Sequence, residues 1–327
     1  MAYSESVLRR ALLRLEEERT HHERETEARK AAVYEKYPRL QEIDRELRAT
    51  SAHVMAVCFR RGEDPTSAMA QLKEENLMLQ REREWLLESN DIDPDELADT
   101  PFCAECGGRG YNGAVMCDCL RELCRQEQKK ELSSLIGSGK ESFEKFRLDV
   151  YPTQIDPELG LSPRDLMTHT LGRAQRYAKT FDADADSVLM LGATGLGKTF
   201  LSACIARAVA DRGFSVVYET AGRIFSDFED MKFGRTDDDP TRKYLTCDLL
   251  ILDDLGTEMT TSFVQSALYQ IVNTRLMAKK STIISTNLPP QEIGRRYQQA
   301  VASRIEGEYR IVPFFGEDIR RLKKERG

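Results

Sequence analysis

A glycine-rich segment of eight residues carries the clearest chemical signal in the sequence. It fits the pattern G-x-x-x-x-G-K-[ST] at every fixed position and reads Gly192-Ala193-Thr194-Gly195-Leu196-Gly197-Lys198-Thr199. In such a loop the backbone N–H groups curl around a β-phosphate, the lysine reaches the β- and γ-oxygens, and the threonine hydroxyl ligates Mg²⁺. The segment therefore predicts a site for ATP and Mg²⁺, and Phe200 extends it at the start of the next helix.

The residues on either side of this loop have the patterns of a strand and a helix. Residues 187–191 are a short, mostly apolar run, and residues 200–211 place Leu201, Ile205 and Val209 on one face. A strand that enters the loop and a helix that leaves it favour a phosphate-binding loop over an idle glycine-rich turn.

A second chemical signal follows about fifty residues later, where the apolar run 249–252 ends in Asp253 and Asp254. Apolar runs of this kind are typical of central strands in a parallel sheet, whose C-terminal ends lie where ligands bind. We expect Asp253 to hold Mg²⁺ through water and Asp254 to polarise the attacking water, as a general base does. The alternative is a strand that ends in a solvated acidic turn.

Four cysteines fall within seventeen positions, at Cys103, Cys106, Cys117 and Cys119. The spacing C-x2-C followed by C-x-C offers four thiolates to a tetrahedral, structural Zn²⁺ site. We see no secretion signal, and a reducing compartment favours metal over disulfides. Cys124 could take the place of Cys119, and ordinary reduced thiols are the alternative to a metal site.

The composition of the 327 residues indicates a cytoplasmic protein of more than one domain. No apolar run is long enough to span a membrane, and the N-terminus lacks a basic-then-apolar pattern. The net charge of −7 falls within residues 1–100, where 23 Asp and Glu stand against 16 Lys and Arg. This acidic region favours a protein partner over nucleic acid.

The first hundred residues are charged and helix-forming, with a break near residues 61–65. Two helices in a hairpin or coiled coil are the simplest prediction, and a pair of solvated helices without a partner is the alternative. Apolar stripes with polar interruptions mark the two helices: Leu8, Leu12 and Leu15, then Met69, Leu72, Leu79 and Leu86.

The remaining pattern predicts an α/β fold. A helix over 163–179 precedes the first strand, and strands are expected at 187–191, 215–219, 249–253, 282–286 and 310–314. Strands that alternate with helices form a parallel sheet with helices on both faces. We therefore divide the chain into a helical arm (1–99), a zinc-binding element (100–124), a linker (125–140) and an ATPase domain (141–327).

Five motifs follow one another as in the bacterial replicative helicase loaders of the DnaC/DnaI type, which are AAA+ ATPases. They are the phosphate-binding loop, Asp-Asp-Leu-Gly at 253–256, Ser-Thr-Asn-Leu at 285–288, Ser-Arg-Ile at 303–305 and Gly-Glu-Asp-Ile-Arg at 316–320. The resemblance covers residues 140–327 and implies five parallel strands in the order 5-1-4-3-2. The cysteine-rich element is similar to the zinc-binding N-terminal domain of the DnaI branch, where a long helical region ahead of it is less usual.

The resemblance also implies roles for three polar residues. Asn287 matches sensor 1, which orients the attacking water, and Arg320 matches sensor 2, which contacts the γ-phosphate in the same subunit. Arg304 matches the arginine finger that reaches a neighbouring subunit's nucleotide, although Arg295, Arg296 and Arg310 compete for that role. The plainer alternatives are a turn residue for Asn287, a local ion pair for Arg304 and a basic tail around Arg320.

These implied roles lead to an expected function and to two alternatives. The resemblance implies slow ATP hydrolysis across AAA+ interfaces of a self-assembled protein that loads a hexameric replicative helicase onto single-stranded DNA. Residues 231–235 offer an aromatic side chain between two cations for base stacking, or merely an ordinary helix end. The alternatives are an IstB-like helper ATPase that acts with a transposase on DNA, and an adaptor that binds ATP without hydrolysing it.

Overall fold

The computed structural model describes residues 3–58, 65–135, 141–157, 160–235, 239–319 and 321. The chain divides into two compact units, which are described separately. The helical unit is Arg14–Cys117, and the sheet unit combines Met1–Leu13 with Asp118–Gly327. No helix of the described residues is both long enough and apolar enough to cross a membrane.

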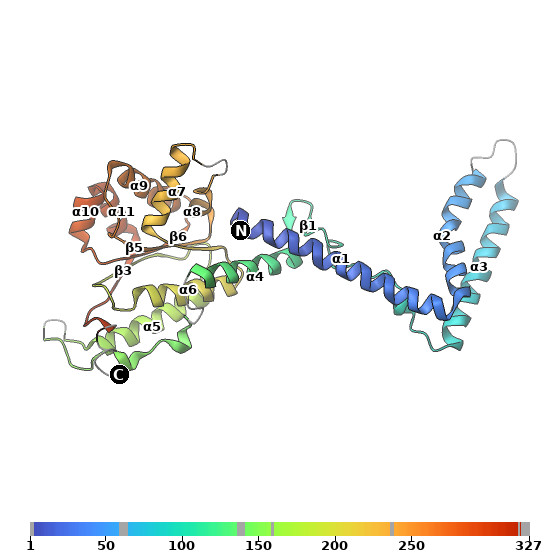
Figure 1. Ribbon diagram of the computed structural model, residues 1–327, viewed down its shortest axis with the longest axis horizontal. Helices are drawn as coiled ribbons and strands as arrows, with labels where there is room; N and C mark the ends of the chain where they lie inside the picture. The colour runs from blue at the N-terminus through green and yellow to red at the C-terminus, as the bar shows by residue number, and fades with distance from the viewer. Residues whose placement is uncertain are drawn as a thin grey trace. The chain divides into compact units, whose positions relative to one another are not determined.

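The sheet unit is built on five parallel strands (Figure 1). Their order is β4-β5-β6-β3-β7. When these five strands are numbered 1 to 5 along the chain, from β3 to β7, this is the predicted order 5-1-4-3-2 read from the other edge of the sheet. The fold expected from the sequence is therefore confirmed. The strands are β3 (Ser187–Leu191), β4 (Val216–Thr220), β5 (Leu249–Leu255), β6 (Ser281–Thr286) and β7 (Tyr309–Pro313).

Helices cover both faces of this sheet, which explains why its central strands are apolar throughout (Figure 1). Successive residues of β5 alternate between two cores: Leu249 and Ile251 pack on one face, and Leu250 and Leu252 on the other. One face is covered by α5 (Pro163–Thr180) and α6 (Lys198–Asp211). The other is covered by α7 (Ala221–Lys232), α8 (Arg242–Thr246), α9 (Ser262–Met277), α10 (Pro290–Tyr297) and α11 (Gln299–Glu308).

Residues 125–135, which we expected in a linker, belong to the helix α4 (Asp118–Leu135). A buried stripe with helical spacing runs along it, at Leu120, Cys124, Gln128 and Leu132. The Gln128 side chain donates to the Phe214 carbonyl at 2.9 Å and accepts from the Val216 N–H at 2.9 Å. The helix is therefore fastened to the edge strand β4 and is part of the sheet unit.

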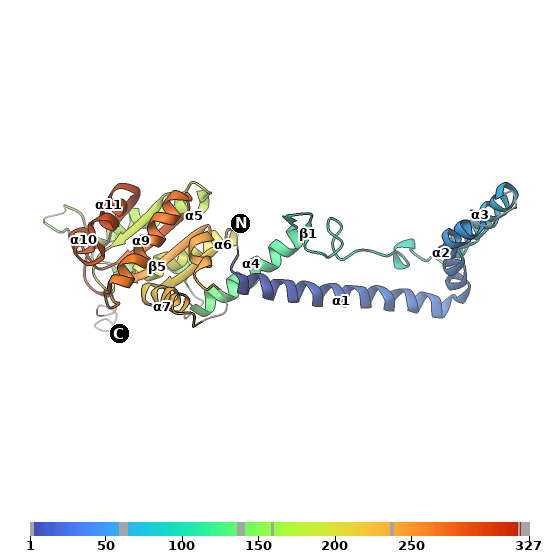
Figure 2. The same cartoon turned by 90° about the horizontal axis from the view of Figure 1, so that it is seen from above.

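The described residues of the helical unit form three α-helices, where the sequence predicted two. They are α1 (Glu5–Lys36), which begins in the sheet unit, α2 (Pro38–Cys58) and α3 (Pro65–Ser89). Pro38 causes the additional break, because proline disfavours helical backbone at the preceding residue and readily begins a helix. Both views show α2 and α3 side by side as a hairpin (Figures 1 and 2). The predicted break at 61–64 lies outside the described residues.

Candidate functional site

The phosphate-binding loop joins the end of β3 to the start of α6, as its flanking patterns predicted. A Cβ atom on Gly192 would lie 2.2 Å from the Phe314 carbonyl oxygen, and Gly197 adopts a left-handed φ of 93°. Only glycine fits these two positions without strain. Lys198 Nζ donates to the carbonyl oxygens of Gly192 and Ala193 at 2.6 and 2.8 Å, which holds the ammonium group over the loop.

The first acid of the predicted pair is buried beside this loop. Asp253 is 4% exposed, and its Oδ1 accepts a hydrogen bond from Thr199 Oγ1 at 3.4 Å. A threonine hydroxyl and a carboxylate are the hard oxygen ligands that Mg²⁺ prefers. Thr199 and Asp253 therefore converge as the sequence predicted, and their chemistry fits a magnesium ion.

The second acid faces the solvent because the strand is irregular at its end. The pairing of β5 with β6 shifts register between Leu252 and Leu255, and Asp254 adopts a left-handed φ of 59°. A bulge of this kind changes the direction of a side chain from the one that strict alternation between the two faces of the sheet would give it. Asp254 is consequently exposed on the side of the sheet that carries the phosphate-binding loop.

A cavity of about 440 Å³ brings most of the predicted nucleotide residues together. Its lining includes Asp253, Asp254 and the loop from Thr194 to Phe200. Gly192 and Ala193 form the base of the loop, where their carbonyls hold Lys198. The sequence analysis missed the opposite wall, which is formed by Glu141, Lys145, Phe146, Arg147, Val150 and Tyr151, with Thr220 and Ile319 nearby.

Two aromatic side chains, Phe146 and Tyr151, belong to this missed wall. Tyr151 OH donates to the Leu196 carbonyl at 2.9 Å, and the ring of Phe146 stacks on Tyr151 with centroids 6.1 Å apart. Phe200 meets Phe146 edge to face at 5.8 Å. Burial raises the pKa of Tyr151, so its hydroxyl stays a neutral donor to the loop. A flat apolar wall beside a phosphate loop suits a nucleobase.

Two of the three residues assigned through the resemblance, Asn287 and Arg304, are not among the residues that line the cavity. Asn287 is exposed after β6, and its Oδ1 lies against Gly256, 3.3 Å from where a Cβ would stand. Arg304 is half-buried and bonds Asn273 Oδ1 and Tyr269 OH of its own chain, each at 3.1 Å. Arg320 lies outside the described residues. The proposed roles of these three residues therefore remain predictions.

The three arginines that compete with Arg304 for the finger role make different contacts in the structure. Arg296 donates to Thr260 Oγ1, Gly256 O and Glu258 O at 2.7, 2.7 and 3.0 Å, so it clamps the loop that follows the acid pair. Arg295 and Arg310 are exposed and pair with Glu292 and Asp186. The clamping role of Arg296 was not predicted, because it depends on carbonyl groups that no motif reveals.

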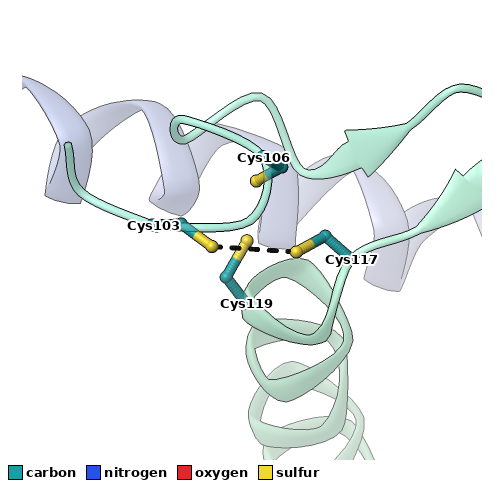
Figure 3. A group of neighbouring side chains, drawn as sticks. All are labelled: Cys103, Cys106, Cys117 and Cys119. Carbon is teal, nitrogen blue, oxygen red and sulfur yellow. Dashed lines mark hydrogen bonds between the residues drawn. The ribbon is translucent and has the colours of Figure 1, made fainter.

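The four predicted cysteines converge on one point (Figure 3). All four sulfur atoms lie within 4.8 Å of one another, and the Sγ atoms of Cys103 and Cys117 are 3.7 Å apart. Four sulfurs about 2.3 Å from a tetrahedral Zn²⁺ would be separated by about 3.8 Å. Cys119 completes the group, while Cys124 is buried in α4, where burial raises its thiol pKa to about 11. The four thiols therefore fit a zinc ion.

The turn around this cluster also suits thiolate ligands. The short hairpin of β1 (Tyr111–Asn112) and β2 (Val115–Met116) returns the chain to Cys117. The N–H of Gly110 points at Cys106 Sγ at 3.3 Å, and such a donor stabilises a negatively charged sulfur. The glycines here supply left-handed backbone, as at Gly110 with a φ of 78°.

A parallel sheet in the order 5-1-4-3-2, with a phosphate-binding loop after β3 and an acid pair on β5, defines an AAA+ P-loop ATP-binding fold. Within that class, residues 174–326 match the family of IstB-like ATP binding proteins. This part of the chain is therefore similar to the IstB-like ATP binding proteins and to the DnaC helicase loaders, as the motifs suggested.

Individual relatives share only part of the chain. The replicative helicase loader DnaC of Escherichia coli K12 is 27% identical over 139 residues, which are 42% of this chain and 57% of the relative. An ATP-binding protein in an insertion sequence of Mycobacterium tuberculosis is 30% identical over 105 residues, 32% of this chain and 42% of that protein. The crystal structure of DnaI aligns with a TM-score of 0.46 at 19% identity, over 59% of this chain and all of that one.

Proposed function

We propose that this protein is a cytoplasmic ATPase that loads a hexameric replicative helicase onto single-stranded DNA. The observation that carries the proposal is the convergence of Lys198, Thr199, Asp253 and Asp254 around one cavity in a domain related to a helicase loader. The helical arm (1–99), the cysteine-rich element (100–124) and the ATPase domain (141–327) keep their expected boundaries as part of this proposal, while residues 125–135 belong to α4 and not to a linker.

Each residue of the cavity has a role in this proposal. Lys198 would leave its two carbonyl partners and bind phosphate oxygens, while Asp254 would hold and deprotonate the attacking water. Thr199 and Asp253 would hold Mg²⁺, which would neutralise part of the phosphate charge. The wall of Phe146 and Tyr151 would take the adenine ring and exclude water from that side.

Arg304 would act between subunits, together with Asn287 and Arg320 within each subunit. To reach a neighbour's phosphate, the guanidinium of Arg304 must exchange Asn273 and Tyr269 for that ligand. Hydrolysis would then depend on self-assembly and would be slow in the isolated chain. Zn²⁺ held by the four cysteines would fix the fold of their segment rather than take part in the reaction.

The second candidate is a transposition helper of the IstB type. The match of residues 174–326 to the IstB-like family and the relative encoded in an insertion sequence favour it. The acidic helical arm and the cysteine cluster favour the loader, because both offer surfaces beyond the ATP-binding domain.

Binding to purified partners separates the two candidates. The full-length chain is mixed with the replicative helicase of its source organism, with ATP, and the mixture is analysed by size-exclusion chromatography. We expect co-elution, and loading of the helicase onto closed circular single-stranded DNA that depends on Lys198. Lys198→Ala is the matched control, which should still bind the helicase through the arm and fail to load it. No complex with the helicase, but a complex with a transposase on duplex DNA, would overturn the loader in favour of the helper.

A further inference from the structure

Tyr218 is a buried tyrosine of β4 whose hydroxyl meets the proposed magnesium ligand. Tyr218 OH donates to Asp253 Oδ2 at 2.7 Å, and the two residues are 5% and 4% exposed. Their strands pair directly, and Tyr218 lies opposite Ile251, two residues before Asp253. No motif marks this tyrosine, because residues 216–220 have the pattern of an ordinary strand.

The other oxygen of the same carboxylate is held from the opposite side of β5. Ser285 of β6 donates through Oγ to Asp253 Oδ1 at 2.5 Å, and the same oxygen accepts from Thr199. Hydroxyl groups on both neighbouring strands therefore fix the plane of the Asp253 carboxylate. The terminal torsion of an aspartate has only a broad preference of its own, so this orientation comes from the hydrogen bonds.

The hydrogen-bond partners of Asp253 orient its carboxylate group without neutralising its charge. Its three hydrogen-bond donors are the neutral hydroxyls of Thr199, Tyr218 and Ser285, and within the described part of the chain no lysine or arginine pairs with it. Hydrogen bonds offset part of the cost of burying a carboxylate and leave its negative charge available to a cation.

The tyrosine hydroxyl is the donor in its pair with Asp253, because an ionised carboxylate can only accept hydrogen bonds. The hydroxyl of Tyr218 also lies 3.5 Å from Ser202 Oγ, which belongs to the helix that follows the phosphate-binding loop. The hydroxyls of Ser202 and Tyr218 thus connect this helix to Asp253.

We propose that Tyr218 is a positioning residue for the magnesium ligand: its hydroxyl holds the Asp253 carboxylate so that Oδ1 faces the Thr199 hydroxyl. The inference rests on the nucleotide site of the proposed function and adds a residue outside its motifs. Hydrogen bonds to a metal-ligating carboxylate typically account for about 10- to 100-fold in metal affinity. A phenylalanine at 218 would keep the packing of the ring and free the carboxylate to rotate.

The test measures the dissociation constant of a fluorescent ATP analogue with the full-length chain, once in Mg²⁺ and once in EDTA. We expect Tyr218→Phe to lose roughly 10-fold of the affinity gained from Mg²⁺ and to match the wild type in EDTA. Tyr244→Phe is the matched control, because Tyr244 OH donates to Asp227 at 2.6 Å in a similarly buried pair in the core on the other face of the sheet. It should keep the full gain.

Two results would overturn the positioning role. One is an unchanged gain from Mg²⁺ in Tyr218→Phe, and the other is an equal loss in Mg²⁺ and in EDTA, which would indicate a structural role only. If Tyr218→Phe does not fold, Ser285→Ala removes a second hydroxyl from the same carboxylate, and an unchanged gain there would also overturn it. A wild-type protein that binds the analogue without any gain from Mg²⁺ would instead overturn the magnesium site itself.

Discussion

At the scale of single residues, the proposed nucleotide site divides into groups that we expect to bind ATP and a group that we expect to take part in its hydrolysis. Lys198 and Thr199 lie at the start of α6, where backbone N–H groups and the helix dipole favour an anion. Asp254 of β5 has a left-handed backbone conformation, and the residue is exposed. Substitutions at these positions should therefore separate affinity from turnover.

The first prediction concerns that separation. Lys198→Ala should weaken ATP binding by roughly 100-fold, because a cation that contacts the phosphates is removed from a partly buried site. Asp254→Asn should bind ATP as the wild type does and lose turnover by about 10²- to 10⁴-fold, since an amide cannot accept the proton. Isothermal titration and phosphate release measure the two quantities. Equal ATP affinity of wild type and Lys198→Ala would refute the assignment of the loop.

Sequence alone predicted the residues whose chemistry is local. The phosphate-binding loop and the acid pair are continuous segments, so their types and spacing were sufficient. The contacts of Tyr218, Tyr151 and Arg296 were missed because each is made with a partner far away in the chain, and a plain strand or helix pattern does not reveal such a partner.

At the scale of elements, the parallel sheet was predictable because both of its faces are buried and its strands are therefore apolar runs. Its order followed from the resemblance and is confirmed. Two helical boundaries were not predicted. The signal for the break between α1 and α2 was present in Pro38, and α4 shows an apolar stripe whose meaning depends on its contact with β4.

The second prediction concerns the cysteine cluster. Protein prepared without chelator should contain about one zinc per chain, because four sulfurs already stand at distances suited to the ion. Replacing Cys103 and Cys106 together by serine should abolish the zinc and make the segment around residues 100–120 sensitive to protease. Cys124→Ser is the control and should keep the metal. Elemental analysis that finds no zinc in the wild type would leave the cysteines as ordinary thiols.

The third prediction concerns the end of α7. Phe233 is 59% exposed, and the cations of Lys232 and Arg235 lie 5.9 and 5.3 Å from the centre of its ring. If this ring stacks on a base, Phe233→Ala should weaken binding of single-stranded DNA roughly 10-fold, as expected for the loss of one stacked base. Trp85→Ala removes another highly exposed aromatic ring and should have no effect in the same anisotropy titration. Unchanged DNA affinity of Phe233→Ala would show that the ring has no contact with DNA.

At the scale of the whole molecule, a finger role for Arg304 would require more than one copy of the chain. The described cavity is lined by Lys198 and both acids, while Arg304 is bonded to Asn273 and Tyr269 of its own subunit. If Arg304 serves a neighbour's site, activity belongs to the interface between subunits and rises with protein concentration.

The fourth prediction tests that interface by mixing two inactive variants. Arg304→Ala keeps an intact nucleotide site, and Lys198→Ala keeps an intact arginine, so mixed assemblies should contain some complete interfaces and recover part of the ATPase activity. Arg310→Ala, which removes another exposed arginine, is the control and should be active without mixing. No recovery from two folded variants that still assemble together would remove the finger role of Arg304.

The two hydrogen bonds that Lys198 makes to its own loop also affect which anions the loop selects. The carbonyls of Gly192 and Ala193 compete with any incoming ligand for the same ammonium protons. Because they belong to the same loop as Lys198, their local concentration beside the ammonium group does not depend on the protein concentration. Any anion that binds Lys198 must therefore offset the loss of both hydrogen bonds. A chain of two or three phosphates has more oxygen atoms for the lysine and for the backbone N–H groups of the loop than inorganic phosphate has. We therefore expect the two carbonyls to widen the preference of the loop for a nucleotide over inorganic phosphate.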